Sequence, residues 1–206
     1  MSVSTGRPYR STLREERALE TRLRIRKSAR KLFAAKGFVE TTINEIAEDA
    51  GVAPQTVYSV FGSKGGIVAA ILEDLQETAG ESTRIAEIVS EEDSHRQLRL
   101  FVSWVRTFFE QGAPVIRAVL TAQSAPDVAA LADQGDQNRQ YGTRELAGMW
   151  ASRGALRDGI ELEDAAQRLW LLTSAEQYML ATDKLGWNPD QYEQWLGDLL
   201  ERELLK

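Results

Sequence analysis

Apolar side chains recur along most of the chain at the three- and four-residue spacing of an amphipathic α-helix. The first stripe lies within residues 13–36, and Gly37 follows it where a left-handed helix cap is expected. Later stripes predict helices over residues 42–50, 54–60, 64–78, 91–111, 114–123, 137–153, 162–185 and from 189 onward. No segment shows the alternation of a half-buried strand, so we expect an all-α fold with about nine helices.

Residues 42–64 have the layout of a helix-turn-helix. The run Thr42–Glu45 reads as a capping box, Gly51 breaks the chain, and Pro54 suits the first turn of a new helix. A short helix that packs against the rest of its domain on one face can enter the major groove of DNA with the other, because the groove admits one α-helix. Three apolar side chains are expected to pin the second helix from behind: Val57, Val60 and Phe61.

The opposite face of this second helix is the candidate DNA-reading surface. Gln55 suits adenine, and Thr56 suits a thymine methyl group or a phosphate. Tyr58 and Lys64 suit backbone phosphates, as does the helix start at Thr42. The candidate DNA-binding residues of this segment are Thr42, Pro54, Gln55, Thr56, Tyr58, Ser59 and Lys64.

The charge of the chain is unevenly distributed. Residues 1–64 carry 12 Lys and Arg against 7 Asp and Glu, whereas the remainder carries 13 against 24. The basic segment 1–64 (the head) and the acidic remainder of the chain (the body) indicate that the head binds a polyanion. Chance clustering of the charges is the alternative. We expect residues 1–14 to form a flexible arm whose Arg7, Arg10 and Arg14 reach phosphates or the minor groove. The basic residues of the first helix are more simply a solvated face.

Composition excludes several classes of protein and site. The 206 residues contain no Cys and a single His, so disulfides, thiolate sites and His-rich metal sites are ruled out. His95 lies in the polar run EEDSHRQ, where a surface role is expected, and no catalytic constellation shows. No apolar run approaches a membrane span, and the first residues lack the apolar core of a signal peptide. We therefore expect a cytoplasmic protein with no cofactor, no metal and no membrane partner.

The stretch KGFVETTINEIAEDAGVAPQTVYSVFGSKGGI resembles the DNA-binding domain of the TetR family of transcriptional regulators. The run LWLLTSAEQYMLATDKLGWNPDQYEQWL resembles the last two helices of a large subgroup of that family. The resemblance covers residues 15–80 and 160–204, and the middle matches only in helical layout. The elements that carry it in the head are Phe33, Gly37-Phe38, Thr41-Thr42, Ile46-Ala47, Ala50-Gly51-Val52, Thr56, Tyr58, Phe61 and Ser63-Lys64.

The resemblance implies a homodimer that binds a double-stranded palindromic operator. It divides the chain into an arm (1–14), a DNA-binding domain (15–62) and a domain for effector binding and dimerisation (63–206). The last two helices of each subunit would pair with those of the partner, which would explain why residues 162–185 are apolar on nearly all sides. The implied dimerisation residues are Leu172, Met179, Trp195, Leu196 and Leu199.

The resemblance also implies a repressor released by a small molecule, which we expect to be largely apolar. Arg106, Arg117 or Gln177 would supply a polar contact to it. Two alternatives stay open: these aromatic residues form an ordinary core, and the protein is a regulator or interaction protein of the same fold without an effector. The candidate ligand-binding residues are Phe101, Trp104, Phe108, Trp150, Trp170, Gln177 and Tyr178.

One departure from the family pattern stands after Ser63-Lys64, where relatives carry acidic or long residues. This chain has Gly65-Gly66 there. Each glycine costs about 1 kcal/mol of helix stability. The pair therefore indicates either a less stiff link between head and body or a hinge.

Overall fold

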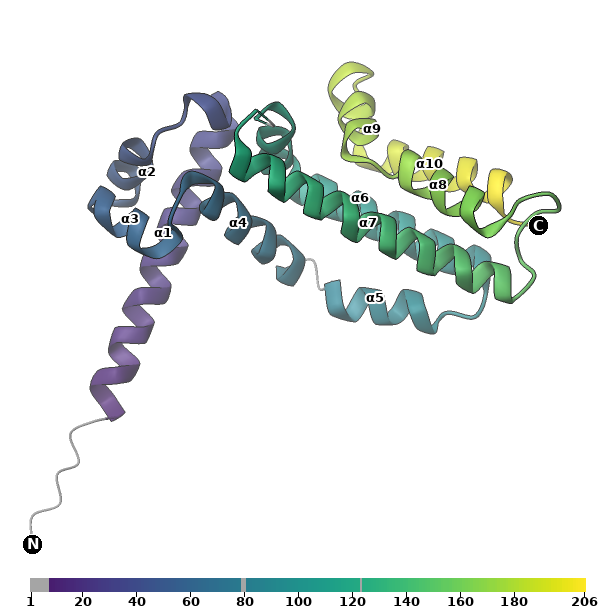
Figure 1. Cartoon of the computed structure of the whole chain (residues 1–206), viewed down its shortest axis with the longest axis horizontal. Coiled ribbons are helices and arrows are strands. Elements are labelled where there is room, and N and C mark those ends of the chain that lie inside the picture. Colours follow the sequence, from purple (N-terminus) through teal and green to yellow (C-terminus); the bar gives the residue numbers. More distant parts are fainter. Residues whose placement is uncertain (1–7, 79–80, 123) are drawn as a thin grey trace, which may run out of the picture. The chain divides into compact units, whose positions relative to one another are not determined.

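The computed structural model describes residues 8–78, 81–122 and 124–206. Within these ranges it contains ten α-helices, one π-helical segment and an isolated β-bridge, and no strand (Figure 1). The all-α prediction is confirmed. The helices are α1 (Pro8–Glu40), α2 (Ile43–Ala50), α3 (Pro54–Phe61), α4 (Lys64–Thr78), α5 (Glu81–Ser90), α6 (Ser94–Thr121), α7 (Pro126–Ser152), α8 (Leu162–Leu172), α9 (Ala175–Met179) and α10 (Pro189–Leu204), with the π-helical η1 (Leu180–Lys184) after α9.

The chain divides into two units, one ending at Ile71 and one beginning at Leu72. This division falls inside α4, later than the boundary expected at residues 62 and 63. The reason is burial, because the first half of α4 contributes apolar side chains to the core of the head. The fully buried side chains of this core include Ile25, Ala29, Ile46, Val57, Ile67, Val68 and Ile71.

Helix α1 differs from the expectation at its start. It begins at Pro8, so the predicted flexible arm of residues 1–14 is helical from Pro8 onward. Near its other end, Gly37 has φ 79° and ψ 174°, which interrupts the helix where the cap was predicted. The arm prediction overlooked that proline is favoured in the first turn of a helix.

The second unit is built around the long helix α6, which packs against α10. A series of ion pairs joins α6 to α10 and η1 in antiparallel register. Most of these side chains are partly exposed, so each pair adds little to stability, but together they oppose a slip of one helix along the other. The ion pairs are Arg99 with Asp198 (2.8 Å), Arg106 with Asp190 (2.5 Å) and Arg117 with Asp183 (2.7 Å), and a hydrogen bond between His95 and Glu201 (2.6 Å) continues the series.

Two helix assignments of the second unit were wrong. The helices expected over 91–111 and 114–123 are one helix, because α6 continues through Pro114. The helix expected over 162–185 is broken after Leu172, since the Ser174 hydroxyl accepts the backbone N–H of Gln177 at 3.3 Å and starts a new helix. An apolar run does not reveal such a break, because the residues on both sides are buried.

The structure gives Gly66 a steric role. A Cβ atom at this position would lie 2.0 Å from the carbonyl oxygen of Phe61 and 3.1 Å from its carbonyl carbon. The backbone N–H of Gly66 also donates to the Ser63 hydroxyl at 3.0 Å, which caps α4. Glycine at this position therefore permits a close approach of α4 to the end of α3.

None of the described helices is long and apolar enough to cross a membrane. A search of the described residues also finds no group of three or more His, Cys, Asp or Glu side chains that could hold a metal ion.

Candidate nucleic-acid interface and ligand site

The turn between α2 and α3 is fixed by backbone hydrogen bonds. Gly51 adopts the left-handed conformation with φ 64° and ψ 42°, which a residue with a side chain rarely adopts. Its N–H donates to Ala47 O, and the N–H of Val52 donates to the same carbonyl at 2.9 Å. Pro54 then opens α3 with its φ already suited to a helix. The angle between the two short helices is therefore set by the local sequence.

Helix α3 has a buried side and an open side, and of the three apolar side chains expected on the buried side only Val57 is fully buried, while Val60 and Phe61 are half-buried. Val57 is fully buried, whereas Tyr58 is 50% exposed and Gln55 and Ser59 are also exposed. Thr56 is half-buried, and its carbonyl accepts the Ser59 hydroxyl at 2.9 Å. Three adjacent polar side chains on an exposed helix can reach base edges and phosphates in a major groove.

The ammonium group of Lys64 is engaged in contacts within the first unit. Its ammonium group donates to the carbonyl oxygens of Phe38 (2.5 Å) and Thr41 (2.7 Å). The same group lies 4.1 Å from the centroid of the Phe38 ring. These carbonyls lie after the break at Gly37, in the segment that leads from α1 to α2, and the cation supplies hydrogen bonds to them. A phosphate contact of Lys64 stays a prediction.

Thr42 is likewise used within the head, in the capping box that was predicted. Its hydroxyl accepts the N–H of Glu45 at 3.3 Å, and its own N–H donates to the Glu45 carboxylate at 2.9 Å. Lys36 pairs with the same carboxylate. The Lys36 ammonium and the Thr42 donors lower the pKa of Glu45 to about 2. An internal carboxylate thus occupies the start of α2, where a DNA phosphate was expected.

Further basic side chains of α1 fasten the other end of α2. Arg24 donates to Ala50 O at 3.2 Å, in the last turn of that helix. Lys31 pairs with Asp49 at 2.5 Å and lowers the pKa of that carboxyl, with help from the Ser28 hydroxyl. Part of the positive charge of the head therefore stabilises the helix-turn-helix itself.

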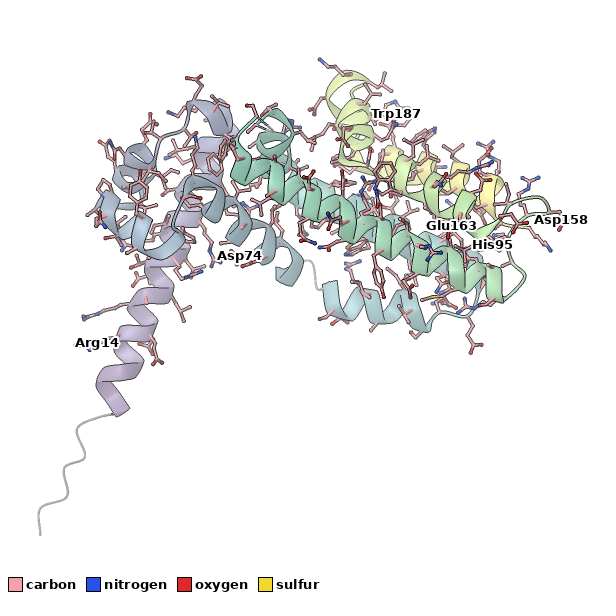
Figure 2. The ribbon with its side chains drawn as sticks, in the orientation of Figure 1. Arg14, Asp74, His95, Asp158, Glu163 and Trp187 are labelled. Carbon is pink, nitrogen blue, oxygen red and sulfur yellow. The ribbon has the colours of Figure 1, made fainter. Side chains whose placement is uncertain are left out.

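The three N-terminal arginines predicted to contact DNA differ in whether the structure describes their side chains. Arg7 lies outside the described residues, as does the side chain of Arg10. Arg14 is an exposed residue of α1 (Figure 2). The structure thus places one of these three side chains, on a helix.

In the body, most of the predicted ligand residues lie along one series of aromatic rings. Neighbouring ring centroids are 5.0–6.1 Å apart from Phe101 on α6 to Trp195 on α10. Gln177 lies on α9 beside Tyr178. The series runs through Phe101, Trp104, Phe108, Phe109, Tyr178, Tyr192 and Trp195.

Trp150 belongs to a different cluster. Its indole N–H donates to the side-chain oxygen of Gln97 at 2.8 Å, and Arg153 donates to the same oxygen at 3.1 Å. The Gln97 amide donates to the carbonyl of Ile88 at 2.6 Å. These bonds tie α5, α6 and α7 together, and Trp150 is a fully buried core residue in the single subunit. Its role in a ligand site stays a prediction.

Two of the polar residues expected at that site are engaged in ion pairs. Arg106 pairs with Asp190 and Glu110, and Arg117 makes two hydrogen bonds to Asp183 at 2.7 and 2.8 Å. The structure shows a hollow of about 330 Å³ on the surface between α6 and α10, lined by Arg99, Val102, Asp190, Glu193 and Gln194. None of the predicted ligand residues lines this hollow.

Some buried polar atoms of the body have no hydrogen-bond partner among the described residues. They include the indole N–H groups of Trp104 and Trp170 and the hydroxyl of Tyr192. Tyr192 is fully buried. An unsatisfied buried polar group costs about 1–3 kcal/mol, so each one requires an explanation. The sequence pattern did not single out Tyr192, because its spacing is that of an ordinary core position.

The predicted dimerisation residues fall into two groups. Leu196 is fully buried and Met179 nearly so in the single subunit, so both belong to its core, and their role in dimerisation stays a prediction. Leu172, Trp195 and Leu199 are half-buried. Leu171, which was not predicted, is 56% exposed. An apolar run gives no signal that separates a core leucine from one on the open side.

Residues 25–71 match the family model described as bacterial regulatory proteins of the tetR family. Over 79 residues the chain is 38% identical to the HTH-type transcriptional regulator TtgR of Pseudomonas putida. That match covers 38% of this chain and 38% of the relative, so the chain spans well under half the length of TtgR.

Two solved structures share the fold over nearly the whole chain. A protein of Saccharomonospora viridis in complex with choline has a TM-score of 0.72 and 24% identity, covering 91% of this chain and 98% of that one. NalD, the secondary repressor of the MexAB-OprM multidrug efflux pump in Pseudomonas aeruginosa, has a TM-score of 0.73 and 21% identity, covering 92% and 98%.

Proposed function

We propose that this chain, a member of the TetR family of bacterial regulatory proteins, is a transcriptional repressor that binds a palindromic DNA operator as a homodimer. The observation that carries the proposal is the geometry of α3, whose fully buried Val57 turns Gln55, Tyr58 and Ser59 outward. A helix fixed from behind in this way suits the major groove.

The proposed contacts with DNA are of two kinds, contacts to bases and contacts to the phosphate backbone. Gln55 is proposed to read a base, while Pro54, Thr56 and Ser59 flank it on α3. Tyr58 suits a backbone phosphate. Arg7, Arg10 and Arg14 remain proposed phosphate or minor-groove contacts.

Dimerisation is proposed to use the last two helical segments of the body. Part of the accessible apolar surface of these segments comes from Leu171, Leu172, Trp195 and Leu199. A dimer sets two copies of α3 about one DNA turn apart, roughly 34–36 Å.

A small, largely apolar effector is proposed to release the DNA. Effector and operator then oppose one another reciprocally, typically by about 1–3 kcal/mol. The choline bound by the Saccharomonospora viridis protein and the repressor role of NalD support this mode of action. The alternative is a regulator or interaction protein of the same fold that has no effector.

Fluorescence anisotropy tests the proposal with duplexes from the region upstream of the protein's own gene, at two salt concentrations and with heparin as competitor. We expect Gln55→Ala to weaken binding to the preferred duplex about 5- to 150-fold, the equivalent of about 1–3 kcal/mol for a lost base contact. The salt dependence should be unchanged, since no phosphate contact is lost.

Gln140→Ala is the matched control, because Gln140 is an exposed glutamine on α7. It should bind the duplex as the unaltered chain does. A chain that prefers no duplex over heparin would contradict the DNA-binding function and favour the interaction protein.

A further inference from the structure

The contacts of Lys64 close a loop of the chain that contains both helices of the helix-turn-helix. Lys64 is the first residue of α4, and its ammonium group donates to Phe38 O at 2.5 Å and to Thr41 O at 2.7 Å. The Val39 carbonyl oxygen lies 3.4 Å from the same nitrogen. Helices α2 and α3 lie in the sequence between these carbonyls and Lys64. Lys64 therefore joins the segment that enters the helix-turn-helix to the segment that leaves it.

The carbonyls that accept from Lys64 belong to residues that are themselves held in the core of the head. Phe38 is buried, and the centroid of its ring lies 5.5 Å from that of Phe33. Thr41 is fully buried, and its hydroxyl donates to Gly37 O at 2.7 Å. The residue after Thr41 is the N-cap of α2. A cation bound to these carbonyls is therefore fixed relative to the start of α2.

The first turn of α4 is also bound closely to the end of α3. The N–H of Ser63 donates to Phe61 O at 2.8 Å, and the N–H of Gly62 donates to Tyr58 O at 2.9 Å. The missing side chain of Gly66 lets the first turn of α4 lie directly against the Phe61 carbonyl. A displacement of the end of α3 would therefore have to break these bonds or move the start of α4 with it.

Closure of this loop restricts how α3 presents its polar side chains. The contacts of α1 described above hold α2, whereas Lys64 links the end of α3 to the start of α2. The exposed side chains of Gln55 and Ser59 therefore keep one direction relative to the rest of the head. Hydrogen bonds to base edges depend on such a direction, while the attraction to phosphates acts over a longer distance and carries no sequence information.

We propose that Lys64 is a positioning residue for sequence-specific DNA binding. Its ammonium group holds α3 at the angle that base contacts require, and it does so through backbone carbonyls of its own chain. This inference rests on the proposed function, because it assigns a role within the proposed DNA-binding unit. The phosphate contact that the sequence predicts is the competing role of the same side chain, and the two roles differ in their effects on salt dependence and selectivity.

Lys64→Gln in the full chain separates the two roles, with fluorescence anisotropy on the preferred duplex and on an unrelated duplex of the same length. We expect the affinity for the preferred duplex to fall about 5-fold or more, as for a lost base contact, and that for the unrelated duplex to stay within about 2-fold. The salt dependence should be unchanged. Equal weakening of both duplexes would overturn the proposal, and a salt slope lower by about one would identify a phosphate contact.

Lys64→Arg keeps the positive charge and decides the question if the glutamine variant does not fold, which far-ultraviolet circular dichroism shows. A guanidinium is larger than an ammonium group and holds its donors in one plane, so it fits poorly among three carbonyl oxygens that surround a single nitrogen. The ratio of the affinities for the two duplexes should fall about 3-fold or more at an unchanged salt slope. A phosphate contact would tolerate arginine, so an unchanged ratio in this variant would contradict the positioning role.

Lys184→Gln is the matched control, because Lys184 is an exposed lysine on η1 in the second unit. It should bind both duplexes as the unaltered chain does. If the unaltered chain binds no duplex, the proposed function fails. If the unaltered chain binds selectively and Lys64→Gln binds with the same selectivity, only the positioning role of Lys64 fails.

Discussion

At the scale of single residues, two positions have roles that their type alone does not suggest. Lys64 looks like a phosphate ligand in the sequence, yet its ammonium group binds the carbonyls of Phe38 and Thr41. Gly66 looks like a weak point in a helix, yet the Phe61 carbonyl leaves no room for a Cβ atom beside it. In both cases the role of the residue depends on a nearby backbone carbonyl oxygen, and a sequence pattern does not show where that oxygen lies.

Gly66→Ala should destabilise the head. Helix propensity alone would make alanine the better residue by about 1 kcal/mol. The clash with backbone should outweigh this gain, and we expect a net loss of about 1–3 kcal/mol in the free energy of unfolding, as for other overpacked sites. Urea unfolding followed by far-ultraviolet circular dichroism measures the change.

Gly142→Ala is the control for this substitution. Gly142 lies inside α7, and a Cβ atom there would meet nothing within 4 Å. Its replacement should stabilise the chain by up to about 1 kcal/mol. If both alanine variants gained stability alike, Gly66 would be a flexible position and the steric explanation would be wrong.

At the scale of helices, the start of α2 depends on one carboxylate. Glu45 binds the Thr42 N–H and hydroxyl and pairs with Lys36, and its pKa falls from 4.5 to about 2. A carboxyl whose pKa is lower in the folded chain contributes stability above pH 4.5, and this contribution is lost as the pH falls toward 2. The capping box is therefore an acid-sensitive element.

Glu45→Gln should reduce this pH dependence. The amide keeps a side-chain oxygen for the cap but loses the charge that Lys36 requires. Acid titrations followed by circular dichroism should show the variant less stable than the unaltered chain at pH 7, with the difference shrinking between pH 4.5 and 2. A constant difference across that range would mean that Glu45 does not titrate with the fold.

The sequence predicted the helix boundaries more accurately in the first unit than in the second. Short helices with caps, such as α2 with Thr42 and Gly51, follow from local rules, so α2 and α3 were located almost to the residue. In the body the run 162–185 is buried on several sides, and its pattern hides the break at Ser174. The orphaned hydroxyl of Tyr192 depends on neighbours from other helices, which no local rule supplies.

At the scale of the whole molecule, the proposed dimer makes a specific demand on surface residues. Leu171→Glu places a charge on an apolar side chain that is 56% exposed in the single subunit. Burying that charge in a subunit contact would be costly without a partner. Size-exclusion chromatography with light scattering should show dimers for the unaltered chain and mainly monomers for the variant at micromolar concentration.

Tyr141→Glu serves as the comparison, because Tyr141 is an exposed aromatic residue on α7. It should remain dimeric. Dissociation by Tyr141→Glu with intact dimers for Leu171→Glu would place the subunit contact on another surface.

The π-helical turn at Leu180–Lys184 also affects how this chain should be aligned with related sequences. A π-turn holds one residue more than the α-turn it replaces, so it accommodates a single-residue insertion at the end of this helical segment, before the loop that leads to α10. Relatives with a regular helix here should be one residue shorter. An alignment that forbids a gap at this point would shift every position of α10 by one and pair core residues with surface residues.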